Sequence, residues 1–240
     1  MNHDTVYAHP RDTIEAFRFD GRVADVFENM ISRSVPGYAF TLELAGLVAA
    51  QYGMEGTRCY DLGCSLGAST LVVRRHLPAS CHLTGIDNSP AMVERCRAIV
   101  SRDHSEAPTE ILEQDIRDTH VTNASVVVMN YTLQFIPPHE RLELLARIAA
   151  GMVTGGALLL SEKIRFEDNT RQSFMTDLHH EFKRSQGYSD LEIAQKRAAL
   201  ENVLVPDTEA EHLDRMRDAG FRTAQVVSRC INFSSILAIR

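Results

Sequence analysis

The sequence is poor in the features that mark secreted, membrane-spanning or nucleic-acid-binding proteins. No stretch approaches about 18 uninterrupted apolar residues, the length that crosses a membrane. The N-terminal stretch MNHDTVYAHPRDTIEAF has no apolar segment of the kind found in signal peptides. Basic residues are not in excess, since the net charge is −7, whereas proteins that bind polyanions usually carry a basic surface. We therefore expect a cytoplasmic protein that neither spans a membrane nor binds nucleic acid directly.

Cysteine is also scarce, and its spacing is uninformative. The five cysteines are odd in number and none forms a CxxC pair, which argues against a disulfide framework and against a zinc site. We expect reduced thiols and no metal. At 44% hydrophobic and 24% charged, the composition is that of an ordinary globular protein. The length of 240 residues predicts a single domain over 1–240.

Short β-type runs alternate with helical patterns between residues 57 and 163, the segment in which we expect the nucleotide-binding core. The expected strands are 57–60, 81–86, 110–113, 125–130 and 157–161, and the expected helices are 68–76, 90–102 and 138–152. The run SVVVMN (125–130) is apolar throughout, as in a strand that is buried on both faces. Gly155 and Gly156 are expected to separate the last helix from the last strand. This alternation predicts a parallel sheet covered by helices on both faces.

The end of the chain breaks the alternation. Residues 221–227 and 231–239 are two β-type runs with no helix between them, so we expect an antiparallel hairpin after a final helix, within 207–240. An α/β sheet of seven mostly parallel strands with such a hairpin is typical of the Rossmann-like class I methyltransferase fold. Residues 21–53 are predicted to form two N-terminal helices that break at SVPGY (34–38). Residues 167–205 are predicted to form a helical insertion that caps a cleft or builds a dimer contact.

The loop DLGCSLG (61–67) is the first sign of a cofactor. Ligands of parallel α/β sheets bind at the carboxyl ends of the strands, and glycine allows the backbone to approach them closely. The spacing Gly63-x-x-x-Gly67 differs from the GxGxxG of dinucleotide-binding loops. An acid before the glycines suits a cofactor that carries an ammonium and a sulfonium. The alternative is an ordinary tight turn between a strand and a helix.

Acids end the next two predicted strands. Asp87 lies 26 residues after Asp61, comparable with the distance of about 20 residues at which an acid binds ribose hydroxyls. The alternative for Asp87 is a helix N-cap. Asp115 is placed to accept from an adenine amine, with Ile116 against the ring. Asp118 is an alternative to Asp115, and so is a solvated acidic turn.

Asn130 ends the fourth predicted strand and is placed to contact the methionine portion of a cofactor and the reacting centre. The segment NYTLQF (130–135) lacks the [DN]-PP-[YF] motif with which amino-methyltransferases hold a planar nitrogen. Signals at four successive strand ends indicate S-adenosylmethionine as the ligand.

Six segments make the resemblance specific. SVPGY (34–38), YDLGCSLGAST (60–70), IDNSPAMVERCR (86–97), NYTLQF (130–135), GGALLLSEK (155–163) and QKRAALENV (195–203) together resemble the carboxy-S-adenosyl-L-methionine synthase family. The resemblance covers residues 20–238. It implies a reaction of S-adenosylmethionine with prephenate that gives carboxy-S-adenosylmethionine and phenylpyruvate. It also implies that ten residues bind the cofactor: Tyr38, Gly63, Cys64, Ser65, Asp87, Asn88, Asp115, Ile116, Asn130 and Arg197.

The helical spacing around Arg197 is compatible with this role. Arg197 falls on a stripe with Ile193, Leu200 and Leu204, so we expect it to face a cleft or a partner chain, where it could bind a carboxylate. The alternative is an ion pair with Glu201. Lys196 is expected to point elsewhere and to pair with Glu192.

Two further features are expected to be neither a nucleophile nor a metal site, and the pair His179 and His180 could help to bind a substrate. Cys64 lacks a nearby histidine and is expected to contribute its backbone and not to act as a nucleophile. His179 and His180 point about 100° apart on a helix, so shared metal ligation is not expected.

The acidity of the chain fits an enzyme that makes a small-molecule donor. The resemblance implies that a separate tRNA carboxymethyltransferase uses the product for wobble-uridine modification, and we expect a homodimer. The alternatives are a conventional small-molecule methyltransferase and a non-catalytic subunit that binds S-adenosylmethionine.

Overall fold

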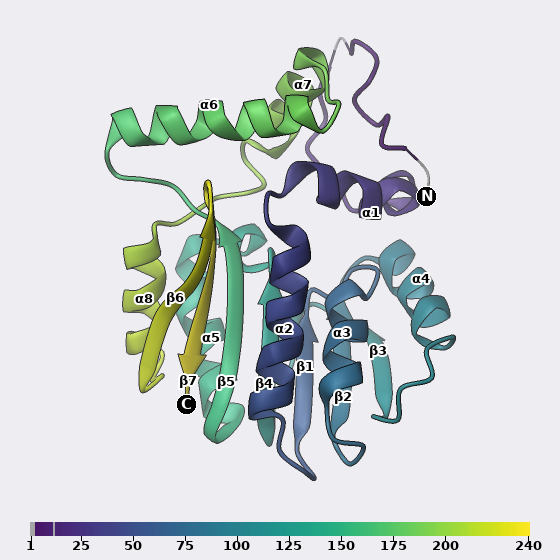
Figure 1. The fold of residues 1–240 in the computed structure, drawn as a ribbon, viewed down its shortest axis with the longest axis vertical. Coiled ribbons are helices and arrows are strands. Elements are labelled where there is room, and N and C mark those ends of the chain that lie inside the picture. Colours follow the sequence, from purple (N-terminus) through teal and green to yellow (C-terminus); the bar gives the residue numbers. More distant parts are fainter. Residues whose placement is uncertain (1–2, 12) are drawn as a thin grey trace.

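A computed structural model describes residues 3–11 and 13–240 (Figure 1). Its seven strands form one sheet in the order β3-β2-β1-β4-β5-β7-β6. β1 to β5 run parallel, whereas β7 runs antiparallel to both β5 and β6. The bounds are β1 Arg58–Leu62, β2 His82–Asp87, β3 Thr109–Glu113, β4 Ala124–Asn130, β5 Met152–Lys163, β6 Thr223–Cys230 and β7 Phe233–Ile239. The predicted fold class is confirmed, including the antiparallel hairpin.

Helices cover both faces of this sheet. Val126 and Val128 of β4 point to one face, where they pack with residues of α2 and α3, and Val127 and Met129 point to the other, with residues of α5 and α8. All four valine and methionine side chains are buried, as expected for a central parallel strand. The helices are α1 Gly21–Ser34, α2 Tyr38–Tyr52, α3 Ala68–His76, α4 Pro90–Val100, α5 Arg141–Gly151, α6 Asn169–Ser185, α7 Asp190–Leu200 and α8 Glu209–Asp218, with 3₁₀ turns at Ile116–Asp118, Leu133–Phe135 and Pro138–Glu140.

Two predicted boundaries are wrong. Gly155 and Gly156 do not separate a helix from a strand, because β5 begins at Met152 and runs through both glycines. The pairing of β4 with β5 is irregular there, and Gly155 takes up the irregularity at a φ of +81° that other residues rarely adopt. The helix expected from Pro138 begins as a 3₁₀ turn, and the α-helix starts only at Arg141.

The insertion forms a helical cap over the carboxyl ends of the strands. In Figure 1, α6 lies above β5, β6 and β7, α7 lies at the far end of α6, and α1 lies below α7. Asp168 caps α6 and Ser189 caps α7, so both helices begin where the sequence supplies an N-cap. The N-terminal segment packs on α7, since the Gln195 amide donates to the carbonyls of Tyr7 and His9, both at 2.9 Å. No helix among the described residues has the length and apolar character to cross a membrane.

Candidate active site

The loops after β1 and β4 meet at the carboxyl edge of the sheet. The N–H groups of Gly63 and Cys64 both donate to the carbonyl of Ile86, at 2.8 and 2.9 Å, which folds the first loop over the end of β2. Gly63 has a φ of +86°, and a Cβ there would lie 2.1 Å from Oγ1 of Thr132 in the loop after β4. Only glycine fits this contact. The structure therefore brings these two predicted loops into direct contact.

Asp87 ties the loop after β1 to the start of α4. Its Oδ2 accepts the backbone N–H of Ser65 at 3.0 Å and its Oδ1 accepts that of Ser89 at 2.9 Å. Burial raises the pKa of Asp87, and these two hydrogen bonds oppose the rise. Ser89, and not Asp87, is the N-cap of α4. Each carboxylate oxygen keeps a free lone pair, so Asp87 can still accept from two neighbouring hydroxyls.

The other residues predicted near an adenosine are Asp115, Ile116 and Asn88. Asp115 is half-buried and its carboxylate is already engaged by Arg117, whose Nη2 lies 2.7 Å from Oδ2. This contact lowers the pKa of Asp115. Ile116 is buried at the start of a 3₁₀ turn, and Asn88 is exposed beside Asp87. Oδ1 of Asp115 already accepts two N–H groups of Arg117, so a further donor would have to use Oδ2.

Asn130 has a buried acceptor that lacks a donor. Its Nδ2 donates to Oγ of Ser69 at 3.0 Å, which fixes the amide, while its Oδ1 is buried with no hydrogen-bond partner among the described residues. A buried acceptor without a partner is costly unless a ligand supplies the donor. The next residue, Tyr131, has a φ of +60°, and Ser65 in the facing loop has a φ of +49°. Such backbone conformations in non-glycine residues concentrate at functional sites.

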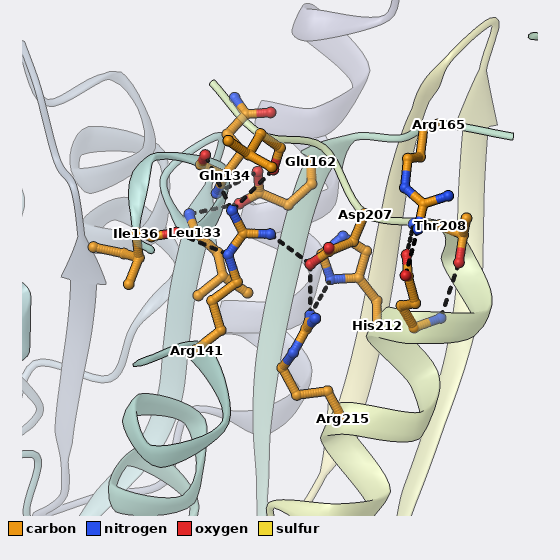
Figure 2. Close-up of polar contacts among 12 residues, drawn as sticks. Leu133, Gln134, Ile136, Arg141, Glu162, Arg165, Asp207, Thr208, His212 and Arg215 are labelled. Carbon is orange, nitrogen blue, oxygen red and sulfur yellow. Dashed lines mark hydrogen bonds and ion pairs between the residues drawn. The ribbon is translucent and has the colours of Figure 1, made fainter. Parts of the chain in front are cut away.

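Glu162 holds the loop that follows Asn130 (Figure 2). Its Oε1 accepts from the N–H groups of Thr132 and Leu133, at 3.1 and 2.8 Å, and its Oε2 accepts from that of Gln134 at 3.2 Å. Glu162 is 1% exposed, and burial raises its pKa to about 8 although these bonds lower it. The carboxyl group of Glu162 therefore sets the path of the chain beyond β4.

Below this loop lies a buried ion pair. Arg141 is fully buried and donates to Asp207 at 2.6 Å and to the carbonyls of Ile136 and Gln134 (Figure 2). Arg215 also contacts Asp207, at 2.8 Å. These hydrogen bonds and ion pairs of Arg141 and Arg215 therefore stabilise the structure behind the strand-end loops.

Tyr38 stands beside Tyr131, which lines a small pocket. The two ring centroids lie 6.3 Å apart, and the Tyr131 hydroxyl is 2.8 Å from Oγ1 of Thr41. Burial raises the pKa of both phenols, so they are neutral at physiological pH. A pocket of about 190 Å³ is lined by Tyr131, Thr41 and Phe233 among others. The resemblance implies that Tyr38 contacts the cofactor, and the structure puts it next to Tyr131, the residue that follows Asn130.

Cys64 and Asp61 are structural in this fold. The Cys64 thiol is buried against Cys96, and this contact, together with burial, raises its pKa. A protonated, buried thiol is a poor nucleophile, in agreement with the predicted backbone role. Asp61 is 1% exposed and accepts from Oγ1 of Thr70 at 2.5 Å. Burial raises the pKa of Asp61 to about 7.

The predicted pairing of Lys196 with Glu192 on α7 is wrong. Lys196 is buried and donates from Nζ to Oγ of Ser34 at 2.9 Å, while Glu192 completes the capping box with Ser189 instead of pairing with Lys196. Arg197 is exposed and lines an open groove of about 440 Å³. The ion pair with Glu201 is not formed among the described residues.

Several residues of this region escaped prediction. Thr132 and Glu162 shape the loop after β4, and Lys163 and Lys183 lie half-buried near it. The segments NYTLQF and GGALLLSEK contain three of these four residues. Nothing in the pattern of either segment shows that Glu162 of the second accepts hydrogen bonds from the backbone of the first. Among the described residues, no group of three or more His, Cys, Asp or Glu side chains is arranged to hold a metal ion.

Comparison with known proteins agrees with this geometry. A family profile described as a methyltransferase domain matches residues 60–156. A solved O-methyltransferase from Nostoc punctiforme is similar in fold, with a TM-score of 0.65 and 15% identity over 92% of this chain. Human N-acetylserotonin methyltransferase has a TM-score of 0.60 and 17% identity over 92% of this chain. This chain spans 59% and 55% of those two structures. The strand order and the similarity to these structures define a class I methyltransferase fold.

The curated relatives are more specific. Carboxy-S-adenosyl-L-methionine synthase of Hahella chejuensis is 55% identical over 99% of this chain and 98% of its own length. The protein of the same name from Aliivibrio fischeri is 50% identical over 100% of this chain and 99% of its own length. The chain belongs to the carboxy-S-adenosyl-L-methionine synthase family.

Proposed function

We propose that the protein converts S-adenosylmethionine and prephenate into carboxy-S-adenosylmethionine and phenylpyruvate. It is a transferase, and half-identity over the full length of relatives that carry the synthase name is the observation that carries this proposal. In the balanced reaction prephenate loses CO2 and its ring hydroxyl. The CO2 becomes a carboxylate on the sulfonium methyl carbon, and the proton that leaves this carbon joins the hydroxide as water.

The strand-end residues supply a matching set of contacts for S-adenosylmethionine. Asp87 has free lone pairs for two ribose hydroxyls, and the backbone of Gly63–Ser65 faces the methionine portion. Asp115 and Ile116 address the adenine. Asn130 presents its unpaired Oδ1 to the reacting end of the ligand, where a polarised methyl group or an ammonium can occupy it. When bound, S-adenosylmethionine supplies a methyl group made acidic by the adjacent sulfonium.

Tyr38 and Arg197 complete the proposed binding set. Tyr38 closes the site beside Tyr131. Arg197 binds the carboxylate that distinguishes the product from S-adenosylmethionine, since a guanidinium can contact both carboxylate oxygens. Its exposed position on α7 fits a site that is completed by closure of the cap or by a second copy of the chain.

The product is a donor for another enzyme. We propose that it passes to a separate tRNA carboxymethyltransferase, because a net charge of −7 is unsuited to tRNA binding by this chain. The five cysteines are all free, which suits a reducing cytoplasm.

The proposed homodimer is supported by exposed apolar side chains on the cap. Phe174 is 62% exposed and Leu178, one turn later on α6, is 41% exposed. Side chains of this kind on one helix face favour contact with a second copy. Light scattering of the protein and of Phe174→Asp tests this, and a wild-type monomer at micromolar concentration would contradict it.

Mass spectrometry of the incubated protein tests the function. With prephenate present, a product heavier than S-adenosylmethionine by one CO2 is expected, together with phenylpyruvate. A conventional methyltransferase would instead release S-adenosylhomocysteine and would be indifferent to prephenate. A non-catalytic subunit would bind S-adenosylmethionine without any turnover.

A further inference from the structure

The lysines of this chain are few, and they gather at one place. Only three of its 25 lysine and arginine residues are lysines: Lys163, Lys183 and Lys196. They lie at the end of β5, in the last turn of α6 and in α7. α6 and α7 belong to the cap, which lies above the end of β5 in Figure 1. The other basic residues of the chain are arginines, so the compact ammonium of lysine is confined to this place.

Phe233 links β5 to α6 at this place. Lys163 pairs with Phe233 across β5 and β7, and the Phe233 ring packs edge-on against the His179 ring of α6, with centroids 5.2 Å apart. Lys183 follows His179 by one helical turn, so it lies on the same face of α6. Lys163 and Lys183 are both half-buried here.

Lys196 has a different, structural role. Its ammonium is buried and donates to Oγ of Ser34, whose carbonyl lies 2.8 Å from Nε2 of His179. Asp4 partly offsets the effect of burial on the pKa of Lys196. Lys196 therefore fastens α7 to α1, and it leaves the other two ammoniums without a comparable partner.

The ammoniums of Lys163 and Lys183 are affected by the positive charges of nearby residues. Burial, followed by the charges of Lys196 and Lys163, lowers the pKa of Lys183 to about 7. Burial and the charge of Arg197 lower the pKa of Lys163. Neither ammonium forms an ion pair with a carboxylate in the part of the chain that the structure describes. Half-buried cations that repel one another reduce stability unless an anion joins them, an arrangement typical of a binding site.

This cluster adjoins the loop after β4. The backbone N–H of Lys163 donates to Oε1 of Gln134 at 3.1 Å. The backbone N–H of Gln134 in turn donates to Oε2 of Glu162 at 3.2 Å (Figure 2). The Phe233 ring also packs against Tyr131, with centroids 5.9 Å apart. Lys163 is therefore connected through direct contacts to the residue that follows Asn130.

We propose that Lys163 and Lys183 bind a carboxylate group of prephenate and hold this co-substrate beside Asn130. The inference rests on the function proposed above and assigns the co-substrate side of the same site. Prephenate carries two carboxylates, so it suits a pair of ammoniums that have no carboxylate partner of their own. Arg197 remains for the carboxylate that the product carries.

The geometry favours a small anion over a polyanion. Lys163 and Lys183 are only partly exposed, and the chain as a whole is acidic, so a phosphate backbone would be repelled before it reached them. Inorganic phosphate shares the charge of prephenate, and competition with phosphate separates a general anion site from a carboxylate site.

Lys163→Gln and Lys183→Gln test the assignment. We expect the KM for prephenate to rise about 10- to 100-fold in each variant, the usual effect of losing one hydrogen bond to a charged group. The Kd for S-adenosylmethionine, measured by titration calorimetry, is expected to stay within about twofold. Arg217→Gln on α8 is the matched control, since it removes one positive charge from a side chain that is 71% exposed.

Two measurements separate a binding role from a structural one. Binding of prephenate in the presence of S-adenosylhomocysteine reports affinity without turnover, and it should weaken in both variants. The melting temperature without ligand should rise in Lys183→Met, because this change removes a repelled ammonium and keeps its apolar stem. A lower melting temperature together with equal weakening of both ligands would make the lysines structural and overturn the proposal.

The remaining outcomes are equally decisive. If the wild type forms the carboxylated product and both variants keep its KM for prephenate, the lysine assignment fails while the function stands. If the wild type forms no such product, the function itself fails. If inorganic phosphate inhibits competitively with an affinity equal to that of prephenate, the carboxylate assignment is overturned.

Discussion

The carboxylate of Asp87 accepts the backbone N–H of Ser65 at 3.0 Å, so the acid that ends β2 fixes the glycine loop that follows β1. One side chain thus both shapes the loop and is free to accept from a ribose. The loop after β1 and the acid that ends β2, which were predicted separately, are thus joined by a hydrogen bond.

Asp87→Asn separates these two roles. The amide keeps one acceptor oxygen for a backbone N–H but turns its NH2 toward the other donors. We expect the affinity for S-adenosylmethionine to fall about 10- to 100-fold, because two charge-assisted bonds to hydroxyls weaken. Titration calorimetry measures this. Glu94→Gln on α4 is the control, since Glu94 is exposed and is not among the predicted cofactor-binding residues. An equal loss in that variant would contradict the role of Asp87.

Gly63→Ala should disrupt the contact between the loops after β1 and β4. Its Cβ would lie 2.1 Å from Oγ1 of Thr132, and φ is +86°. We expect a loss of about 2–4 kcal/mol in the free energy of unfolding, measured with urea. The double variant Gly63→Ala/Thr132→Ala should recover part of this loss because it removes the clashing oxygen but not the backbone strain. No recovery would show that backbone strain alone sets the requirement for glycine.

The strand-end loops could be predicted because each depends on its own sequence. A glycine turn after β1, an acid at the end of β2 and an asparagine at the end of β4 need only the rule that parallel strands end at one edge. Their convergence then follows from the fold.

The face that α7 buries could not be predicted in this way. The apolar spacing pointed to Arg197, but Leu204 lies beyond the end of α7 at Leu200. The inner face is instead set by polar contacts, such as those of Gln195 with the N-terminal segment and of Lys196 with Ser34. Buried polar partners that are distant in sequence leave no hydropathy pattern. The prediction that Gly155 and Gly156 end a helix failed because glycine occurs both in turns and at irregularities within strands.

Arg197→Ala should change which ligand is retained. We expect carboxy-S-adenosylmethionine to bind about 10- to 100-fold more weakly, while S-adenosylmethionine binds as before, because only the former carries the additional carboxylate. Arg184→Ala is a matched control in the same groove, since Arg184 already pairs with Asp190 at 2.8 Å. Mass spectrometry of the ligands retained on purification compares the variants. Equal weakening of both ligands would remove the assigned role of Arg197.

Glu162 should make stability depend on pH. Burial raises its pKa from 4.5 to about 8, so the folded state binds a proton there that the unfolded state has lost. The stabilisation is complete below pH 4.5 and is lost as the pH rises through about 8. Glu162→Gln should flatten this slope and lower stability overall, since the amide cannot accept from all three N–H groups. Melting temperatures between pH 5 and 8 measure the change, and a slope equal to that of the wild type would contradict it.

Lys183 should make the binding of prephenate depend on pH in the same range. Its pKa is lowered to about 7 by burial, Lys196 and Lys163, and a bound carboxylate would raise it again, so binding takes up a proton near neutral pH. The neighbouring His179 and His180 also have lowered pKa values and are neutral there, and Arg197 stays charged. We expect the affinity for prephenate to fall as the pH rises above about 7, as the ammonium of Lys183 loses its proton. Calorimetry in buffers of different ionisation enthalpy counts the protons taken up. Lys183→Arg, which stays charged, should remove the proton uptake, and uptake that persists in this variant would assign it to another group.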